Sequence, residues 1–318
     1  MTLLRFGLAA TLWLAALGAL AASCLAQGGR FSARLDVLTH FAPFYLAAAC
    51  AVLAVALAAY RNAGLLAVAL LAAVASAALI APEFLSRDPS PRADHGPGEL
   101  KLIQFNAWGG NTRPDDAVRW LLAQDADIIV LQEASRLRDK LLAAGYQISC
   151  GRCSAAVFSK ATPVATYAEP PRTGKSSYIS STTFDGPQGA FTVVAVHRHW
   201  PIRFAKDRMQ TANLHAYLAE LPKGRLILAG DFNSTPWSFA RRREDRDLGL
   251  IRRTRALFTW PAGQLSHNRL PAPFPYLPID HVYAGPGWAT VEVRRGPALG
   301  SDHYPVIVTL APRPAGGT

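Results

Sequence analysis

Long apolar runs dominate the first eighty or so residues of the chain and then stop. They cover residues 3–26, 42–60 and 65–81, with polar residues clustered between them at 27–36 and 61–62. Each run approaches the roughly 20 residues that an α-helix needs to cross the hydrocarbon core of a bilayer. The pattern therefore predicts a membrane anchor of three transmembrane helices over residues 1–82.

The first run taken alone also fits a cleaved signal peptide, with Arg5 as its charged start. Residues 21–24 (AASC) even resemble a lipoprotein cleavage site, although Ala stands where Leu is usual. Two further spanning runs follow at once, and a simple secreted protein would not need them. We therefore expect the first run to remain as a transmembrane helix.

Residues 83–99 differ in composition from both of their neighbours. They contain Ser-Arg-Asp-Pro-Ser-Pro-Arg and His-Gly-Pro-Gly, and such Pro, Gly and polar stretches lack a hydrophobic face. We expect an extended linker there. From residue 100 onward, strand-like apolar runs alternate with helix-like ones, which predicts one α/β domain over residues 100–313 and a disordered tail at 314–318.

Two segments of this domain have the periodicity of helices. Residues 115–124 form a short amphipathic pattern with acidic residues in its first turn, where they favour the helix dipole. Residues 209–221 place Leu214, Tyr217 and Leu221 at helical spacing. Both segments are therefore expected to be helices.

Polar side chains recur where the strand-like runs of this domain begin or end. The groups concerned are Asn106, Gln132-Glu133, His197, Gly230-Asp231-Phe232-Asn233, Asp280 and Ser301-Asp302-His303. Loops at strand ends are where catalytic groups usually sit. Carboxylate and amide oxygens together with imidazoles suit an attack on phosphorus assisted by Mg²⁺ or Mn²⁺.

In this order, the segments closely resemble the endonuclease/exonuclease/phosphatase superfamily of metal-dependent phosphoesterases. Its members share a strand-Asn, a Leu-Gln-Glu, a strand-His, a Gly-Asp-Phe-Asn, an Ile-Asp and a Ser-Asp-His, and all six occur here between Asn106 and His303. Each short string alone is more often a turn or a helix cap. Six in the correct order favour catalysis. The resemblance implies an α/β fold in four layers, with two packed mixed sheets and helices outside.

The resemblance also implies a metal site and a set of catalytic groups. Glu133 would be the principal ligand of Mg²⁺ (or Mn²⁺), with Asn106 and Asp302 beside it, and no other cofactor is expected. The residues that would carry catalysis are His197, Asp231, Asn233, Asp280 and His303.

The catalytic groups would divide the work. Asp231 would lie close to the attacking water, and Asn233 would hold that water or a phosphate oxygen. His197 and His303 would contact non-bridging oxygens or transfer protons, which imidazole does well near neutral pH. Asp280 would accept a hydrogen bond from His303 and so fix its tautomer.

Five further polar residues near the motifs are harder to assign. We expect strand alternation to point His199 and His281 away from the site. Members of the superfamily usually place an additional Tyr or Arg against the phosphate. Tyr178, Arg172 and Lys175 are candidates, and no motif selects among them.

The part of the chain from Glu99 onward is strongly basic. It has 27 Lys+Arg against 18 Asp+Glu, which accounts for +9 of the formal net charge of +11. Such an excess favours anionic partners: nucleic acid, anionic lipid headgroups or phosphorylated substrates. The densest basic stretch, residues 241–255, is either a solvated helix face with interleaved acidic residues or a contact surface for a membrane or a polyanion.

Cysteines and flanking charges bear on the side of the membrane. Cys150 and Cys153 form half of a zinc site at most and lack a thioredoxin-like context, so a small disulfide loop is expected, which suits an oxidising compartment. Arginines flanking the apolar runs instead place more positive charge on the side of the α/β domain. With the resemblance to membrane-anchored bacterial members, we expect a multi-pass protein of the cytoplasmic membrane with an extracytoplasmic catalytic domain.

Two substrate classes remain open. One is a phosphoester or pyrophosphate of a membrane lipid. The other is DNA or RNA, cut by an anchored endo/exonuclease that uses its positive charge. The anchor favours the lipid, because a nuclease gains little from three spans. The expected partners are a lipid bilayer and a phosphorylated substrate, lipid-linked or nucleic acid, and no protein partner is evident.

Overall fold

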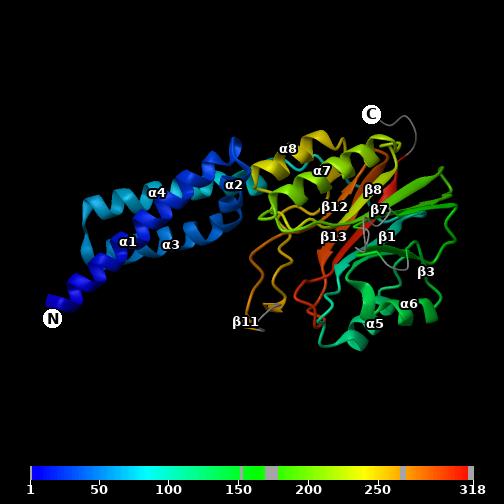
Figure 1. Ribbon diagram of the computed structural model, residues 1–318, viewed down its shortest axis with the longest axis horizontal. Helices are drawn as coiled ribbons and strands as arrows, with labels where there is room; N and C mark the ends of the chain where they lie inside the picture. The colour runs from blue at the N-terminus through cyan, green and yellow to red at the C-terminus, as the bar shows by residue number, and fades with distance from the viewer. Residues whose placement is uncertain (1, 151–152, 169–177, 266–269, 314–318) are drawn as a thin grey trace. The chain divides into compact units, whose positions relative to one another are not determined.

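The computed structural model describes residues 2–150, 153–168, 178–265 and 270–313, and the expected tail at 314–318 lies outside them. The chain forms two compact units (Figure 1). The helical unit comprises Met1–Arg87 together with Ser234–Glu244. The sheet unit comprises Asp88–Asn233 together with Asp245–Thr318. A short internal segment thus belongs with the N-terminal helices, which the sequence did not indicate.

The helical unit is built around α1 (Thr2–Gln27), α3 (Ala42–Val55) and α4 (Ala63–Leu85). Short turns join α1 to α3, namely η1 (Gly28–Arg30), α2 (Ala33–Asp36) and η2 (Val37–Phe41), and a π-helical turn, η3 (Ala56–Tyr60), extends α3. Three helical stretches are long and apolar enough to cross a membrane: Phe6–Arg30, Ala33–Tyr60 and Ala63–Leu85. The expectation of three apolar helices is confirmed.

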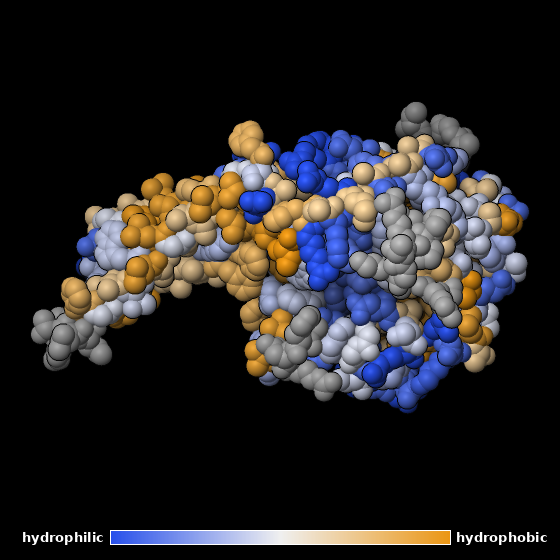
Figure 2. All heavy atoms as spheres, in the orientation of Figure 1, coloured by the Kyte–Doolittle hydropathy of each residue, from blue (hydrophilic) through white to orange (hydrophobic). Residues whose placement is uncertain are grey.

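Small residues bring these helices together. Ala16, Ala49, Ala69 and Ala72 are buried at the helix contacts, and small side chains let apolar helices approach closely in lipid. Large apolar side chains such as Leu14, which is 72% exposed, point outward. Figure 2 shows the resulting apolar surface along the helices. The helical unit is therefore apolar on its outside as well as inside, as a lipid-embedded bundle must be.

Among the described residues, the sheet unit has two six-stranded sheets. The first has the order β13-β14-β1-β2-β4-β3, with β1 (Leu100–Asn106), β2 (Ile128–Gln132), β3 (Gln147–Ile148), β4 (Ala155–Ser159), β13 (Trp288–Arg295) and β14 (Val306–Pro312). The second has the order β5-β6-β7-β8-β12-β9, with β5 (Ala165–Ala168), β6 (Ile179–Phe184), β7 (Phe191–His197), β8 (Leu226–Asp231), β9 (Ile251–Arg252) and β12 (Asp280–Ala284). A separate ribbon pairs β10 (Gly263–Gln264) with β11 (Pro271–Ala272).

Each sheet is mixed, with one parallel pair at its centre. β1 and β2 run parallel in the first sheet, and β7 and β8 run parallel in the second. Strand alternation sorts the apolar residues: Leu102 and Val130 pack between the sheets, whereas Ile103 and Ile129 pack on the opposite face. Strands that are buried on both faces read as continuous apolar runs, which is why the sequence shows no alternation there.

Helices cover the outer faces of the two sheets (Figure 1). α5 (Pro114–Ala123) and α6 (Arg138–Ala143) bury their apolar sides in the cluster that also holds Phe105 of β1. α7 (Phe204–Ala219) packs through Leu214 and Leu218 against β7 and β8. The four-layered α/β sandwich is thus confirmed, and both helices expected from periodicity are present with shifted ends.

Residues 88–99, expected as part of an extended linker, belong to the sheet unit. Ala93 N donates to the carbonyl of Thr290 at 3.1 Å, and Thr290 N donates to the carbonyl of Pro91 at 2.7 Å. The segment thereby pairs with β13, the edge strand of the first sheet. Backbone hydrogen bonds to an unpaired sheet edge need no hydrophobic face, so composition alone does not reveal them.

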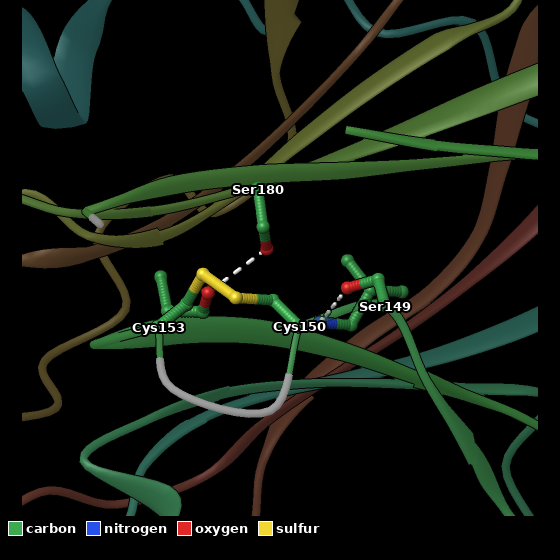
Figure 3. The surroundings of a disulfide bond; sticks show 6 residues. Ser149, Cys150, Cys153 and Ser180 are labelled. Atoms are coloured by element: carbon green, nitrogen blue, oxygen red, sulfur yellow. Dashed lines mark hydrogen bonds between the residues drawn. A yellow bond between two sulfur atoms is a disulfide. The ribbon is translucent and has the colours of Figure 1, made fainter. Parts of the chain in front are cut away.

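Cys150 and Cys153 form a disulfide, as expected, in the connection between β3 and β4 (Figure 3). Their Cα atoms are 5.6 Å apart. Nearby, Ser180 of β6 donates its hydroxyl to the carbonyl of Ala155 at 2.8 Å. The disulfide therefore lies directly before β4, the neighbour of β2.

The basic stretch 241–255 includes arginines whose partners are protein groups. In the helical unit, buried Arg241 pairs with Glu244 at 3.0 Å within α8 (Phe239–Asp247). In the sheet unit, Arg252 pairs with Asp245 at 3.2 Å. Arg253 is buried and donates to the carbonyls of residues 284, 285 and 288, and burial lowers its pKa to about 10. These three arginines stabilise the fold, which neither interpretation from sequence included.

Candidate active site

The polar ends of the strands meet at one rim of the sheet unit, around a cavity of about 640 Å³. Register explains the convergence: His197 pairs with Asp231 where β7 and β8 end, and Asp280 pairs with Asp231 where β12 begins. The predicted site residues that line the cavity are Asn106, Glu133, His197, Asp231, Asn233, Asp302 and His303. Asp280 is fully buried behind them.

Asp231 lies at the centre of the site. Asn106 Nδ2 donates to its Oδ2 at 3.0 Å, and the backbone N–H of Asn233 donates to its Oδ1 at 2.8 Å. His197 Nε2 and His303 Nε2 lie 3.9 Å and 3.8 Å from Asp231 Oδ2. Residues from four strand ends thus surround one buried carboxylate.

Gly230 makes this position of Asp231 possible. β7 and β8 run parallel here, with Val196 paired to Gly230. A Cβ added at Gly230 would lie 2.0 Å from the carbonyl oxygen of Val196. A side chain at this position would therefore push the two strand ends apart.

The carboxyl of Asp231 is poised to gain or lose a proton near neutral pH. Burial raises its pKa to about 7, with the charge of Asp280 adding to the effect, while His303, Asn106 and Asn233 act in the opposite direction. A buried carboxyl with such a pKa is suited to act as a general base.

His303 and Asp280 form a buried pair. His303 Nδ1 lies 2.8 Å from Asp280 Oδ2, and Gln104 Nε2 donates to Asp280 Oδ1 at 3.1 Å. Burial alone would lower the pKa of His303, but the carboxylates of Asp280 and Asp231 outweigh it and raise the pKa to about 10. His303 is therefore a cation, held in place by Asp280.

His197 has the opposite character. Burial lowers the pKa of His197. The charge of Glu133 acts to raise this pKa, because Glu133 Oε1 lies 3.9 Å from His197 Nε2. The site thus presents one cationic and one neutral imidazole. When the surroundings of two similar groups shift their pKa values in opposite directions, one group is commonly the proton donor and the other the proton acceptor.

Glu133 follows β2 at a sharp change of backbone direction, with φ 52°. Its backbone N–H donates to the carbonyl of Ser154 at 3.0 Å, directly after Cys153, and its Oε2 accepts from the N–H of Gly109 at 2.8 Å. These contacts fix both the backbone and the carboxylate. The disulfide loop therefore borders the backbone that carries Glu133.

The donor set fits a hard divalent cation. Asp302 is buried, its Oδ2 accepts from Trp260 Nε1 at 3.2 Å, and its Oδ1 has no hydrogen-bond partner among the described residues. A buried carboxylate oxygen without a donor is costly unless a cation or water satisfies it. With Glu133 and Asn106 on the same cavity, the oxygens are of the type that Mg²⁺ prefers.

A different group of described residues also has closely spaced potential ligand atoms. Asp231, Asp280 and His303 have ligand atoms within 4.8 Å of one another. However, Asp280 already accepts from His303 and from Gln104. We therefore interpret this group as a hydrogen-bonded cluster, and Asn106, Glu133 and Asp302 remain the candidate ligands of a cation.

The expectation for His199 was wrong, because it lines the cavity. β7 ends at His197, so strand alternation no longer applies, and residues two apart on a strand share a face in any case. His281 lies away from the cavity, as expected. It is buried, with ring centroids 5.5 Å from Phe232 and 6.2 Å from Tyr283.

Of the candidates for an extra phosphate contact, only Tyr178 is among the described residues. Its hydroxyl accepts from Asn213 Nδ2 at 3.0 Å, and its carbonyl accepts from the N–H of His197 at 3.0 Å. It is not among the residues that line the cavity. Arg172 and Lys175 lie outside the described residues.

Sequence reasoning missed an aromatic wall of the cavity. Trp108, Trp200 and Trp260 line it, and the rings of Trp200 and Trp260 meet edge to face with centroids 5.9 Å apart. Arg198 lies among them and pairs with Asp207 at 2.7 Å. The signal available in the sequence was that Trp108 and Trp200 lie within three residues after Asn106 and His197, the polar motif residues that end their strands.

Comparisons with known proteins agree with this geometry. A sequence model described as Endonuclease/Exonuclease/phosphatase family matches residues 103–303. Among curated protein sequences, none matches the chain. One similar solved structure is an endonuclease/exonuclease/phosphatase from Beutenbergia cavernae, with 20% identity, TM-score 0.51 and coverage of 68% of this chain and 72% of that one.

Two further similar structures contain DNA. TDP2 of D. rerio, complexed with single-strand DNA product, has 15% identity and TM-score 0.53 over 67% of this chain and 99% of that chain. The 3′ phosphatase NExo from Neisseria, bound to a product DNA hairpin, has 19% identity and TM-score 0.50 over 66% of this chain and 98% of that chain. At these identities the likeness concerns the fold.

Proposed function

The chain belongs to the endonuclease/exonuclease/phosphatase family, and we propose that it hydrolyses a phosphoester or pyrophosphate of a membrane lipid. Members of this family are metal-dependent phosphoesterases, nucleases and phosphatases. The proposal for the lipid rests on one observation: three helices long and apolar enough to cross a membrane belong to the same chain as the site. A substrate confined to the bilayer would be concentrated where such helices hold the enzyme.

The residues of the site support a division of roles. Glu133, Asn106 and Asp302 would hold Mg²⁺ or Mn²⁺, which when bound neutralises negative charge on a phosphate. Asp231, with its pKa raised to about 7, would take a proton from the attacking water. The cationic His303 would stabilise charge that develops on a non-bridging oxygen, because a fixed cation in a buried site is worth more than in water.

The role of Asn233 differs in detail from the one expected, whereas that of His197 does not. Asn233 Nδ2 donates to the carbonyl of Arg198 at 2.8 Å and to Asp231 Oδ2 at 3.2 Å. With both Nδ2 hydrogens engaged, we assign Asn233 to orienting the base, Asp231, and not to donating to a phosphate oxygen. His197, which burial keeps neutral, would accept or relay a proton beside Glu133.

A nuclease is the alternative, and the basic excess of the chain from Glu99 onward is compatible with it. Bases stack on aromatic side chains with little regard to sequence, and Trp108, Trp200 and Trp260 line the cavity. The same wall could equally pack an isoprenoid or acyl chain, so the wall does not separate the two substrates.

A substrate panel separates the two functions. The full chain in proteoliposomes would be given a polyprenyl pyrophosphate, a phospholipid, and single- and double-stranded DNA, each with Mg²⁺. We expect release of phosphate or headgroup from lipid and no cleavage of DNA. DNA cleavage at a comparable rate, lost in Glu133→Gln, would establish the nuclease.

We also propose that the sheet unit faces the outside of the cytoplasmic membrane. The disulfide between Cys150 and Cys153 supports this side, because thiols in the cytosol are kept reduced. The arginines that flank the helices argue for the cytoplasm. The disulfide outweighs them here because it lies within the domain whose location is in question.

A further inference from the structure

Exposed apolar side chains border the candidate active site. Ile202 lines the cavity and is 61% exposed, two residues before α7 begins. Leu270 and Phe274, on either side of β11, are 53% and 65% exposed, and the ribbon that carries them projects away from the two sheets (Figure 1). We call these three residues the apolar rim. All three belong to the sheet unit, and exposed apolar side chains that gather beside a cavity commonly mark a binding surface.

A row of aromatic rings connects the rim to the cavity. The ring of Trp260 meets that of Trp200 edge to face, with centroids 5.9 Å apart, and that of Tyr276 in the same way at 5.4 Å. Ile202 follows Trp200 by two residues, and Phe274 precedes Tyr276 by two. An exposed apolar residue thus lies close in sequence to each end of the row of three rings.

The backbone that carries Trp260 is joined to the candidate cation site. Trp260 Nε1 donates to Asp302 Oδ2 at 3.2 Å, and the N–H of Ala262 donates to the carbonyl of Asp302 at 2.8 Å. Trp260 and Leu277 exchange both of their backbone hydrogen bonds, at 3.0 Å and 2.8 Å. These contacts hold the central ring of the row beside Asp302. An apolar group that packs on the row would therefore lie next to a phosphate at the cation site.

The ribbon side of the rim suits an apolar partner. Residues 270–279 (LPAPFPYLPI) contain no charged side chain, although Arg269, which lies outside the described residues, precedes them. A nucleic-acid strand is held along a protein surface mainly by Lys and Arg. On the other side, Arg203 adjoins Ile202 and lines the cavity, so this side can also hold an anion. The composition of the ribbon favours a hydrocarbon chain over a strand of nucleic acid.

We propose that the aromatic row and the apolar rim bind a long alkyl or prenyl chain of the substrate, which leaves the cavity across Trp200 and Trp260. This rests on the proposed lipid function and adds the residues that recognise the apolar part of the substrate. The cavity, at about 640 Å³, has the size of sites for drug-sized ligands, so it has space for the first methylene groups beside a phosphate. The rim then covers the methylene groups that follow.

The expected effect is a dependence of affinity on chain length. Full burial of one methylene group strengthens binding about fourfold. A chain that lies on the row and the rim buries about one side, which corresponds to about twofold per methylene group. Octylphosphonate has six methylene groups more than ethylphosphonate, and it should therefore bind the wild type roughly 60-fold more tightly.

The test is isothermal titration calorimetry of the full chain in detergent with Mg²⁺, which needs no turnover. Ethylphosphonate and octylphosphonate are the probes, because their C–P bond is not a phosphoester, and their concentrations are corrected for partition into the micelles. The loss variants are Ile202→Ser and Phe274→Ser, and Phe274→Leu is the conservative replacement. Val164→Ser is the matched control, because Val164 is 57% exposed in the sheet unit and is not among the residues that line the cavity.

We expect Ile202→Ser and Phe274→Ser each to reduce the ratio of the two Kd values to below about tenfold, because each removes the contacts of about half of the added methylene groups. Phe274→Leu and Val164→Ser should keep the ratio of the wild type. If one of the serine variants does not fold, Leu270→Ser takes its place.

Three results would overturn the proposal. The first is a wild-type ratio near one, and the second is a ratio that stays unchanged in both serine variants or falls equally in Val164→Ser. The third is tighter binding of thymidine 5′-monophosphate than of octylphosphonate, which would place a nucleoside on the row of rings. Binding that depends on chain length, together with no hydrolysis of any lipid, would instead refute the proposed function and leave this site in place.

Discussion

The buried pair of Asp280 and His303 allows one prediction to be worked out in detail. In Asp280→Asn the side-chain oxygen would remain on Gln104, which donates to Asp280 Oδ1 at 3.1 Å. The new amide NH₂ would then face His303 Nδ1, where the carboxylate oxygen lies at 2.8 Å. An NH₂ can only donate, so it would hold Nδ1 unprotonated. His303 would lose both its orienting acceptor and the charge that keeps it cationic.

The magnitude follows from what such a cation contributes. Removing one preorganised donor from the charge-stabilising set of an enzyme costs about 100- to 1,000-fold in kcat, or about 2.7–4 kcal/mol. Because Asp280 acts through His303, His303→Ala should cost a similar amount. The double variant should be at most about tenfold slower than the slower single variant, since residues that act as one unit are not additive.

The assay is kcat for the four proteins of this cycle at saturating Mg²⁺, with thermal unfolding measured in parallel to confirm that each is folded. Losses that multiply in the double variant would show that Asp280 and His303 act separately. An Asp280→Asn protein with the turnover of the wild type would refute the assigned proton on His303 Nδ1 and the role of the pair.

Three other predictions concern the metal, the strand contact and the disulfide. Glu133→Gln should abolish activity without changing the melting temperature, and EDTA should abolish the activity of the wild type. Full activity in either experiment would exclude the metal assignment. Gly230→Ala should lower the melting temperature by roughly 6–12 °C, because the added Cβ meets the Val196 carbonyl; an unchanged value would mean that the strands separate easily. A membrane-impermeant thiol reagent should find no free thiol at Cys150 or Cys153. Alkaline phosphatase fused after the last residue should be active. Bright fluorescence from a fluorescent protein fused at the same position would instead place the domain in the cytoplasm.

The fold could be predicted largely because its strands are buried on both faces. A continuous apolar run that ends in polar groups, such as the run before Asp231, indicates a strand whose end carries functional residues. Six such strand ends in one order are specific for a family of folds. Register then brings His197 and Asp280 beside Asp231. Local pattern and long-range pairing agree at these positions.

Other features depend on contacts that no local pattern encodes. Whether His199 reaches the cavity depends on where β7 ends, and the bond between Trp260 and Asp302 joins residues 42 positions apart. The residues after Asn233 look like an ordinary turn, rich in Ser, Thr and Pro. Their attachment to the helical unit depends on Asp36 and His40, which precede them by about 200 residues.

The central claim is that the substrate lies in the bilayer that the helices span. The most direct measurement is surface dilution: the full chain is reconstituted with a polyprenyl pyrophosphate at fixed bulk concentration, and inert phospholipid is added. We predict that Mg²⁺-dependent phosphate release falls in proportion to the mole fraction of the substrate in the membrane and is absent in Glu133→Gln. A rate that does not depend on this mole fraction would contradict the account. So would release of phosphate from DNA without any release from the lipid.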